Sequence, residues 1–230
     1  MKLHLLGFIA TAIAITSCKK NHDDTNSLGF SMQLKATNTS VPLSNTSSGA
    51  NAEALRSTAV NINWTARTAS ANQLKFEAKQ NGKEIEFKSS IQQTIDLFGS
   101  NSTLGNISVP AGTYDEIEFK AQLNSVGTNP ALELKGDFTG NSAVMPIRFL
   151  ANETILLKGE KHQVTISSGT LHNAVTNMDL RKLTMNITAT DLENAVRTNG
   201  QILITSAINQ KLYDIIVKNL RNLEDEEEWH

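Results

Sequence analysis

Apolar and polar residues alternate along most of this chain, and the alternation predicts a protein built mainly of β-strands. The clearest segment is 104–123, which we expect to form a strand, a turn and a second strand. In its second half, apolar Ile117, Phe119, Ala121 and Leu123 alternate with charged or amide residues, which is typical of a strand with one buried face. The turn Val109-Pro110-Ala111-Gly112 has Pro and Gly where a type I turn favours them. Such a strand needs others to cover its apolar face, so we expect a sheet.

A β-hairpin is predicted around Asn81-Gly82. A two-residue Asn-Gly loop is a strong hairpin signal because both positions need a positive φ. The loop also fixes the register, so Phe76 should lie opposite Phe87 and Lys79 opposite Glu84. The other charged residues on this face should find opposite charges mainly on the diagonals.

Further alternating segments extend the pattern on both sides. We expect strands at 30–36, 60–64, 132–138, 144–150, 154–157 and 164–166. Turn signals recur about every 8 to 12 residues, which favours a β-sandwich. Pro146 predicts that its strand lies at an edge or contains a bulge. Trp64 lies on an alternating apolar face, and we expect it in the core; the alternative is a stacking platform for a sugar.

The C-terminal part of the chain predicts helices. Residues 171–183 have helical spacing, and we expect a short helix there with a strand after it at 184–188. Thr190-Asp191-Leu192-Glu193 has the order of a capping box at a helix start, and Asn199-Gly200 should end that element. A strand at 202–205 should follow.

A last amphipathic helix is expected after Ser206, which can cap it. Its apolar stripe comprises Leu212, Ile215, Ile216, Leu220 and Leu223. Such a stripe needs a packing partner, most simply the sandwich. The acidic run 224–228 follows, and we expect it to be a solvated tail because consecutive carboxylates lack the alternating spacing of calcium loops.

The first 18 residues have the pattern of a lipoprotein export signal. Lys2 is followed by an apolar run of eleven residues at 5–15, and Thr16-Ser17-Cys18 closes it. This run is too short for a membrane span, which needs about 20 residues. We expect cleavage before Cys18 and acylation of its thiol; the alternative is an ordinary secretory signal with an incidental cysteine. Two or more acyl chains, at about 0.8 kcal/mol per buried methylene, make such anchoring durable.

Charge and cysteine content limit the kinds of partner and the kinds of stabilisation that we expect. Cleavage before Cys18 removes one lysine and leaves 20 basic and 23 acidic residues, a net charge near −3. This balance favours neither nucleic acid nor an anionic membrane surface as a partner. Cys18 is the only cysteine of the chain, so no intramolecular disulfide can form and stability must come from the core.

These observations divide the chain into four expected parts. They are a signal peptide (1–17), a polar lipid tether (18–28), a β-sandwich domain (29–168) and a C-terminal α+β extension (169–230) that packs on the sandwich and ends in the acidic tail 224–230. Within the sandwich, residues 37–51 are almost entirely polar and should form a long loop, either disordered or functional.

One stretch also resembles a known family. Ile95-Asp96-Leu97-Phe98, a polar spacer and then Ile107-Ser108-Val109-Pro110-Ala111-Gly112-Thr113-Tyr114 with an alternating strand resemble the domain of unknown function 4382, which occurs in envelope lipoproteins, notably of Bacteroidota. The resemblance covers about residues 58–140. It implies a β-sandwich on the cell envelope and supplies no activity.

We searched the sequence for catalytic and ligand-binding motifs and found none. The chain lacks a nucleophile elbow, a zinc-protease motif, a phosphate loop and a dinucleotide fingerprint. His162 and His172 are the only histidines of the folded body, and we expect surface or structural roles for them because a metal pair would need further ligands. We therefore expect no catalytic residue, no cofactor and no metal, and Cys18 is the one candidate site residue.

The expected fold is mainly β, an antiparallel β-sandwich of immunoglobulin-like or transthyretin-like form with short helices and an amphipathic C-terminal helix. The expected function is that of a non-enzymatic protein of the outer membrane, anchored by lipid on Cys18 at the periplasmic face or the cell surface, that binds a protein or glycan partner. One alternative is a glycan-binding lipoprotein of a nutrient-uptake system, which needs exposed aromatic residues. Another is an envelope hydrolase that uses scattered carboxylates.

Overall fold

The computed structural model describes residues 29–44, 60–99, 102–140 and 143–223. The expected signal peptide, tether and acidic tail, and residues 45–51 of the expected loop, lie outside the described residues, and so does Cys18. The strands are β1 (Gly29–Thr37), β2 (Ser40–Pro42), β3 (Asn61–Gln80), β4 (Lys83–Asp96), β5 (Thr103–Ile107), β6 (Gly112–Leu123), β7 (Leu132–Thr139), β8 (Val144–Ala151), β9 (Ile155–Ile166), β10 (Leu171–Asp179), β11 (Arg197–Thr198) and β12 (Gln201–Ile204). The helices are α1 (Leu180–Leu183), α2 (Ala189–Glu193) and α3 (Gln210–Leu223).

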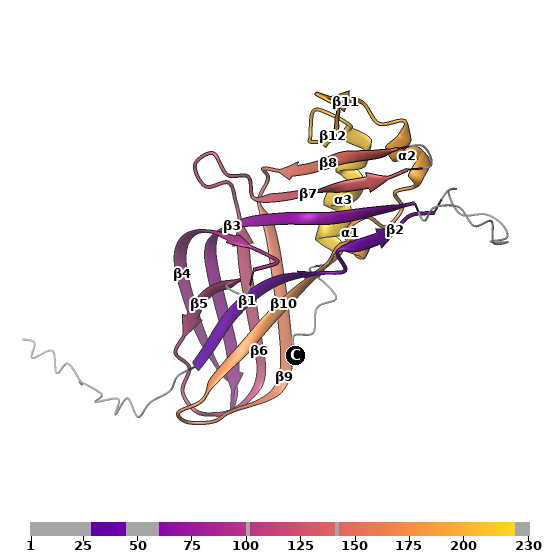
Figure 1. Cartoon of the computed structure of the whole chain (residues 1–230). Coiled ribbons are helices and arrows are strands. Elements are labelled where there is room, and N and C mark those ends of the chain that lie inside the picture. The colour runs from indigo at the N-terminus through magenta and orange to yellow at the C-terminus, as the bar shows by residue number, and fades with distance from the viewer. Residues whose placement is uncertain (1–28, 45–59, 100–101, 141–142, 224–230) are drawn as a thin grey trace, which may run out of the picture.

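The strands form two sheets, and the prediction of a mainly β, sandwich-like fold with short helices is confirmed. The smaller sheet has the order β10-β1-β5, and the larger contains the other nine strands. Two pairings are parallel, β1 with β10 and β8 with β12, so the sandwich is not purely antiparallel. In Figure 1, β1 and β10 cross in front of β6 and β9, while α3 lies behind β7 and β8.

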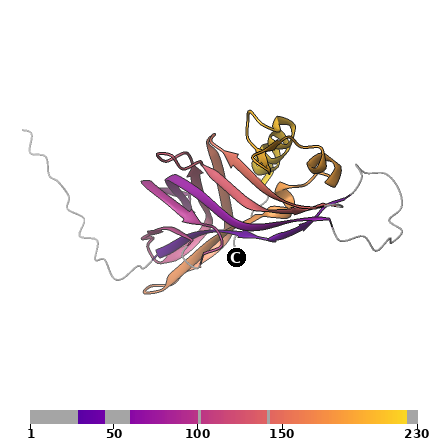
Figure 2. The same cartoon turned by 45° about the horizontal axis from the view of Figure 1, so that its top comes forward.

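Strand β3 joins the two halves of the larger sheet. Its first half pairs with β7, and its second half pairs with β4 on one edge and β6 on the other. The register shifts between Trp64 and Ala66 and again between Ala71 and Gln73, and such bulges let a long strand bend. Figure 2 shows the result, with the helices at one end of the molecule and β4 and β5 at the other.

The predicted hairpin is confirmed residue by residue. Asn81 and Gly82 have φ values of 50° and 72°, and Phe76 lies opposite Phe87 as Lys79 lies opposite Glu84. Trp64 is 2% exposed, so its predicted place in the core is also confirmed.

The stretch 104–123 contains the two predicted strands, but they belong to different sheets. Strand β5 pairs with β1, whereas β6 pairs with β3 and β9. The segment between them therefore crosses from one layer of the sandwich to the other. Tyr114, at 0% exposure, donates a hydrogen bond of 2.8 Å from its hydroxyl to the carbonyl oxygen of Pro110 in this crossing segment.

The prediction of a helix at 171–183 followed by a strand at 184–188 was wrong, because the strand comes first and the helix follows it. Residues 171–179 form strand β10, which pairs in parallel with β1 over nine residues and buries Ala174 and Met178. Only four residues, Leu180–Leu183, then form helix α1. Tertiary pairing with β1 overrides the helical spacing, which a short apolar segment cannot by itself distinguish from a strand.

The capping box lies two residues before the predicted one. Thr188 is the N-cap of α2, where its hydroxyl accepts a hydrogen bond from the Asp191 amide at 3.1 Å and its own amide donates to the Asp191 carboxylate at 3.1 Å. Asn199-Gly200 ends no helix but forms the turn between β11 and β12.

Helix α3 begins at Gln210, so Ser206 is not its cap. Asn209, just before it, has a φ of 54° and binds the backbone of Val196 and Leu203 through its side-chain amide. These bonds fix the point at which the helix begins. The predicted apolar stripe is buried at Leu212, Ile216, Leu220 and Leu223 and partly buried at Ile215.

Both sheets contain strands from each side of residue 168. Strand β10 completes the smaller sheet beside β1, and β12 extends the larger sheet beside β8. The described buried residues of the chain form one hydrophobic core cluster. No helix within the described ranges is long and apolar enough to cross a membrane.

Candidate binding surface

The outer side of strands β4, β3, β6 and β9 carries charged residues at successive outward positions, and we call it the charged face. Every second residue of a strand points to the same side of a sheet, so these side chains form rows across the strands. The charged face comprises Glu84, Glu86 and Lys88 of β4, Lys75, Glu77 and Lys79 of β3, Glu116, Glu118 and Lys120 of β6, and Lys158, Glu160 and His162 of β9.

Two of these rows place like charges directly opposite one another. The lysine row runs across the four strands as Lys88, Lys75, Lys120 and Lys158. The glutamate row beside it runs as Glu86, Glu77, Glu118 and Glu160. Like charges at directly opposite positions destabilise a sheet, so this face requires compensation between rows.

Ion pairs between the two rows provide the compensation. The Glu77 carboxylate accepts from Lys120 at 2.7 Å and from Lys75 at 2.6 Å. Lys158 lies 3.0 Å from both Glu118 and Glu160. The diagonal pairing expected for Glu77 and Lys75 is confirmed in part. Glu77 pairs diagonally with Lys120, and Lys75 lies 3.6 Å from Glu86, but the shortest contact of Lys75 is with Glu77 on the same strand.

These contacts favour the ionised forms of Glu77, Glu116, Lys79 and Lys120. The hydrogen bonds from Lys120 and Lys75 lower the pKa of Glu77 from 4.5 to about 2, and a hydrogen bond from Lys79 lowers the pKa of Glu116. The same bond to Glu116 raises the pKa of Lys79. Burial alone would lower the pKa of Lys120, but its hydrogen bonds to Glu77 and Glu118 raise it.

The direction of these pKa shifts matters for general acid–base catalysis. A general acid or base works best with a pKa near the working pH. Here the pKa values of Glu77 and Glu116 are lowered and those of Lys79 and Lys120 are raised, in both cases away from neutrality. A hollow of about 190 Å³ lies over Glu77, Lys79, Glu116 and Lys120, yet its groups are paired and charged.

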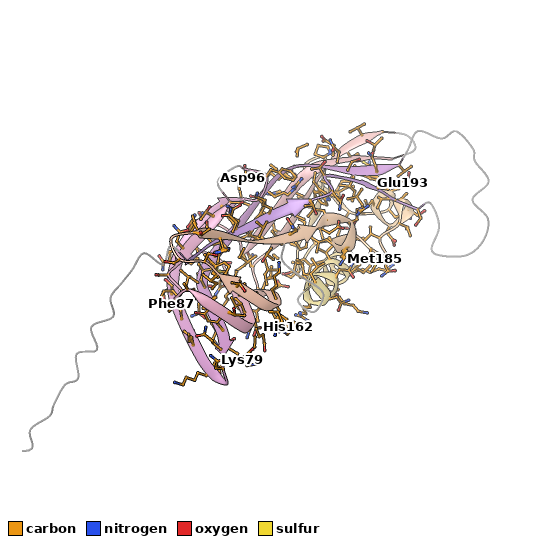
Figure 3. The ribbon with its side chains drawn as sticks, turned by 90° about the horizontal axis from the view of Figure 1, so that it is seen from below. Lys79, Phe87, Asp96, His162, Met185 and Glu193 are labelled. Atoms are coloured by element: carbon orange, nitrogen blue, oxygen red, sulfur yellow. The ribbon has the colours of Figure 1, made fainter. Side chains whose placement is uncertain are left out.

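A carboxylate–imidazole cluster lies at the end of the charged face. Glu116, Glu160 and His162 each offer one ligand atom, all within 4.8 Å of one another, which is close enough for one cation. However, Lys79 already neutralises Glu116 at 2.7 Å, and His162 Nε2 lies 2.9 Å from the Glu160 carboxylate. We therefore assign no metal to this cluster. In Figure 3, Lys79 and His162 lie at the same end of the sheet, and Phe87 lies at its margin.

The two histidines of the folded body are on different sheets. His162 is exposed on β9, whereas His172 is on β10, with its ring centroid 5.5 Å from that of Phe30. His172 Nε2 accepts a hydrogen bond from the Ser167 amide at 3.4 Å. The structure thus brings no His162–His172 pair together.

A buried arginine is the second unusual feature of the described chain. Arg67 of β3 is 1% exposed, and its guanidinium lies over the face of the Phe98 ring. It donates to the carbonyl oxygens of Ala36 and Trp64, both at 3.4 Å. Desolvation lowers its pKa to about 9, against the opposing attraction of Asp96. Arg67 therefore remains charged at neutral pH, and its contacts are those of a structural residue.

Sequence reasoning located half of the charged face. The β3–β4 register followed from Asn81-Gly82, but the contribution of β9 was missed because 154–157 and 164–166 were expected as separate strands. They are one strand, Ile155–Ile166, whose inward row is interrupted at Gly159. The alternation of Lys158, Glu160 and His162 was the signal that could have revealed it.

Comparisons with protein families, curated proteins and solved structures find no match for this chain. The likeness to the domain of unknown function 4382 therefore stays a prediction.

Proposed function

We propose that this chain is a non-enzymatic, lipid-anchored protein of the cell envelope whose sandwich serves as a binding or surface-assembly module. The observation that carries the proposal is Cys18, the only cysteine, at the end of a short apolar export signal. Acylation of its thiol would hold the folded body at the outer membrane, on the periplasmic face or the cell surface.

The charged face supports the binding part of the proposal. Ion pairs within and between neighbouring strands hold many of its lysines and glutamates in place, so the surface presents an ordered pattern of positive and negative groups. A surface of this kind gives specificity through complementary charge on a protein partner. The near-neutral net charge of −2 for the whole chain gives no support to nucleic acid as that partner.

The glycan-binding alternative gains nothing from the described aromatic residues. Sugar recognition uses exposed rings as stacking platforms, but Trp64, Tyr114 and Tyr213 are buried. Among the large hydrophobic residues that are exposed in the described ranges, Phe87 is the only aromatic one. The envelope-hydrolase alternative gains nothing from Glu77 and Glu116, because hydrogen bonds from lysines lower the pKa of both carboxyl groups, away from neutrality.

The anchor is tested with Cys18→Ala, using Ser17→Ala as the matched control because it keeps a small residue before the cleavage site. In cells fed an alkyne-labelled fatty acid, we expect the wild type and Ser17→Ala to be labelled and to pellet with the outer membrane. Cys18→Ala should lose the label and leave the membrane fraction. If Cys18→Ala still pellets after a high-salt wash, the lipid-anchor proposal fails.

A further inference from the structure

We propose that strand β4 pairs antiparallel, along its free edge, with β4 of a second copy of this chain, with Phe87 of both copies on the two-fold axis. This inference deepens the assembly role proposed above by naming the partner, and it rests on that role. It requires neither the acyl chain nor occupancy of the rest of the charged face.

The first observation is an open sheet edge. Within the described residues, β4 pairs with β3 alone. Edge strands expose a row of unpaired N–H and C=O groups and are usually protected by short length, proline, bulges or charged side chains, lysine especially. Strand β4 carries Lys83 and Lys88, so it suits only a partner strand with opposite charges at the facing positions. Strand β4 is 14 residues long and has no proline, and its ladder with β3 is regular over residues 83–90 before the register shift. This stretch can accept another strand.

The second observation is an apolar residue left open at that edge. Phe87 is 44% exposed, although its cross-strand neighbour Phe76 is 1% exposed in the core. Ile85, two residues away on the same side, is only partly buried. A strand added beside β4 would cover both side chains and continue the inner apolar side of the sheet.

The third observation is charge. Inside one copy, Glu86 lies opposite Glu77 and Lys88 lies opposite Lys75, so each faces a like charge on its paired side. With Phe87 on the axis, Glu86 lies opposite the partner's Lys88, and Lys88 lies opposite the partner's Glu86. The glutamate row of one copy then continues into the lysine row of the other. Two opposite-charge pairs form across the junction, each of the kind that stabilises neighbouring strands.

The same logic rejects neighbouring registers. Centring the pair on Lys88 or on Glu86 places that residue against its own copy, which is a like-charge contact. Centring it between two residues sets the inner side of one strand against the outer side of the other. Centring the pair on Phe87 places the two Phe87 rings together on the inner side of the sheet. On the outer side it forms two flanking pairs of opposite charge.

Disulfide trapping tests the axis directly. The full chain carrying Cys18→Ala has no thiol, so Phe87→Cys in that background introduces one. Under mild oxidation at micromolar concentration, we expect Phe87→Cys to form a disulfide-linked dimer. The control is Leu171→Cys on β10, which is matched in exposure at 45% and should remain monomeric. Equal cross-linking of the two variants, or none in Phe87→Cys, overturns the proposal.

A mixing experiment tests the register. Glu86→Cys and Lys88→Cys, each alone in the Cys18→Ala chain, should cross-link poorly because neither residue faces itself. The mixture of the two should give a disulfide-linked heterodimer in several-fold higher yield. If either single variant dimerises as well as the mixture does, the register is wrong.

Charge reversal in solution completes the test without cysteines. By analytical ultracentrifugation of the Cys18→Ala chain, Glu86→Lys should weaken self-association at least tenfold, and Glu86→Lys combined with Lys88→Glu should restore it. Circular dichroism confirms that each variant is folded. A folded parent chain that is monomeric at all concentrations would refute pairing between copies while leaving the lipid anchor untouched.

Discussion

The Tyr114 hydroxyl donates a hydrogen bond of 2.8 Å to the carbonyl oxygen of Pro110, four residues earlier in the chain. Tyr114 is the third residue of β6, and Pro110 lies in the segment that crosses from the smaller sheet to the larger one. The bond therefore fastens the point at which the two layers of the sandwich are joined. Burial of the ring raises the pKa of Tyr114, so the hydroxyl stays protonated and remains a donor.

Tyr114→Phe removes this hydrogen bond and keeps the buried ring. We expect the free energy of unfolding to fall by about 1 kcal/mol, the usual net contribution of one intramolecular hydrogen bond. Tyr114→Ala also leaves a cavity and should cost about 3–5 kcal/mol. Urea unfolding followed by circular dichroism measures both, and a Tyr114→Phe variant as stable as the wild type would show that the bond is not made in solution.

Glu77→Gln tests the ion pairs of the charged face through pH. The folded-state pKa of Glu77 is about 2, below its ordinary value of 4.5, so its stabilisation is fully present above pH 4.5 and is lost as the pH falls toward 2. At pH 7 we expect Glu77→Gln to be less stable by roughly 1–2 kcal/mol, allowing for solvent screening. This difference should shrink steadily from pH 4.5 to pH 2.

The control for Glu77 is Glu86→Gln. Glu86 is 51% exposed and lies 3.6 Å from Lys75, so its replacement should change stability by less than about 0.5 kcal/mol. Urea midpoints at several pH values compare the variants. A difference between wild type and Glu77→Gln that does not change with pH would contradict the assigned ion pairs.

Replacement by alanine should cost much more stability at Gly136 than at Gly82. A Cβ on Gly136 would lie 2.3 Å from the Asn63 carbonyl oxygen and 2.9 Å from Trp64 Cα, and relief requires β7 to separate from β3. We expect Gly136→Ala to cost more than about 3 kcal/mol or to prevent folding. Gly82→Ala meets nothing within 4 Å but keeps a φ of 72°, and it should cost about 1–2 kcal/mol. Similar thermal midpoints for the two variants would refute this packing of β3 against β7.

The effect of replacing Arg67 on stability should depend on the shape of the new side chain. Arg67→Met keeps a long side chain against Phe98 and removes a desolvated charge, so we expect stability within about 1 kcal/mol of the wild type or higher. Arg67→Ala leaves a cavity in the core and should lose about 2–4 kcal/mol. Thermal unfolding of the two variants distinguishes a packing role from an ionic role, and equal losses would indicate that the charge itself is needed.

The sequence contained the local parts of this structure and little of the long-range pairing. Asn81-Gly82 defined a register that the structure reproduces, because the turn chemistry and the hydrophobic pattern pointed to the same pairing. By contrast, nothing near residues 171–179 indicates that β1, more than 130 positions earlier, lies beside them. Pairing with β1 makes these residues a strand in spite of their helical spacing, and the spacing of apolar residues contains no information about that pairing.

The charged face, too, could be predicted only where it depends on local sequence. The charges of β3 and β4 could be assigned to one face from the hairpin, whereas those of β6 and β9 join it only through pairings set by the fold. The buried position of Arg67 was also not predictable, since a bulge in β3 near Trp64 determines which side chains point inward. Cys18, in turn, lies outside the described residues, and its proposed acylation rests on the sequence alone.

The proposed acylation of Cys18 as the N-terminus of an envelope protein is tested most directly by mass spectrometry of the N-terminal peptide of the protein extracted from its own membranes. We expect a peptide that begins at Cys18 and carries a diacylglycerol group on the thiol. A peptide that begins at another residue, or that contains Cys18 with a free thiol, would contradict it.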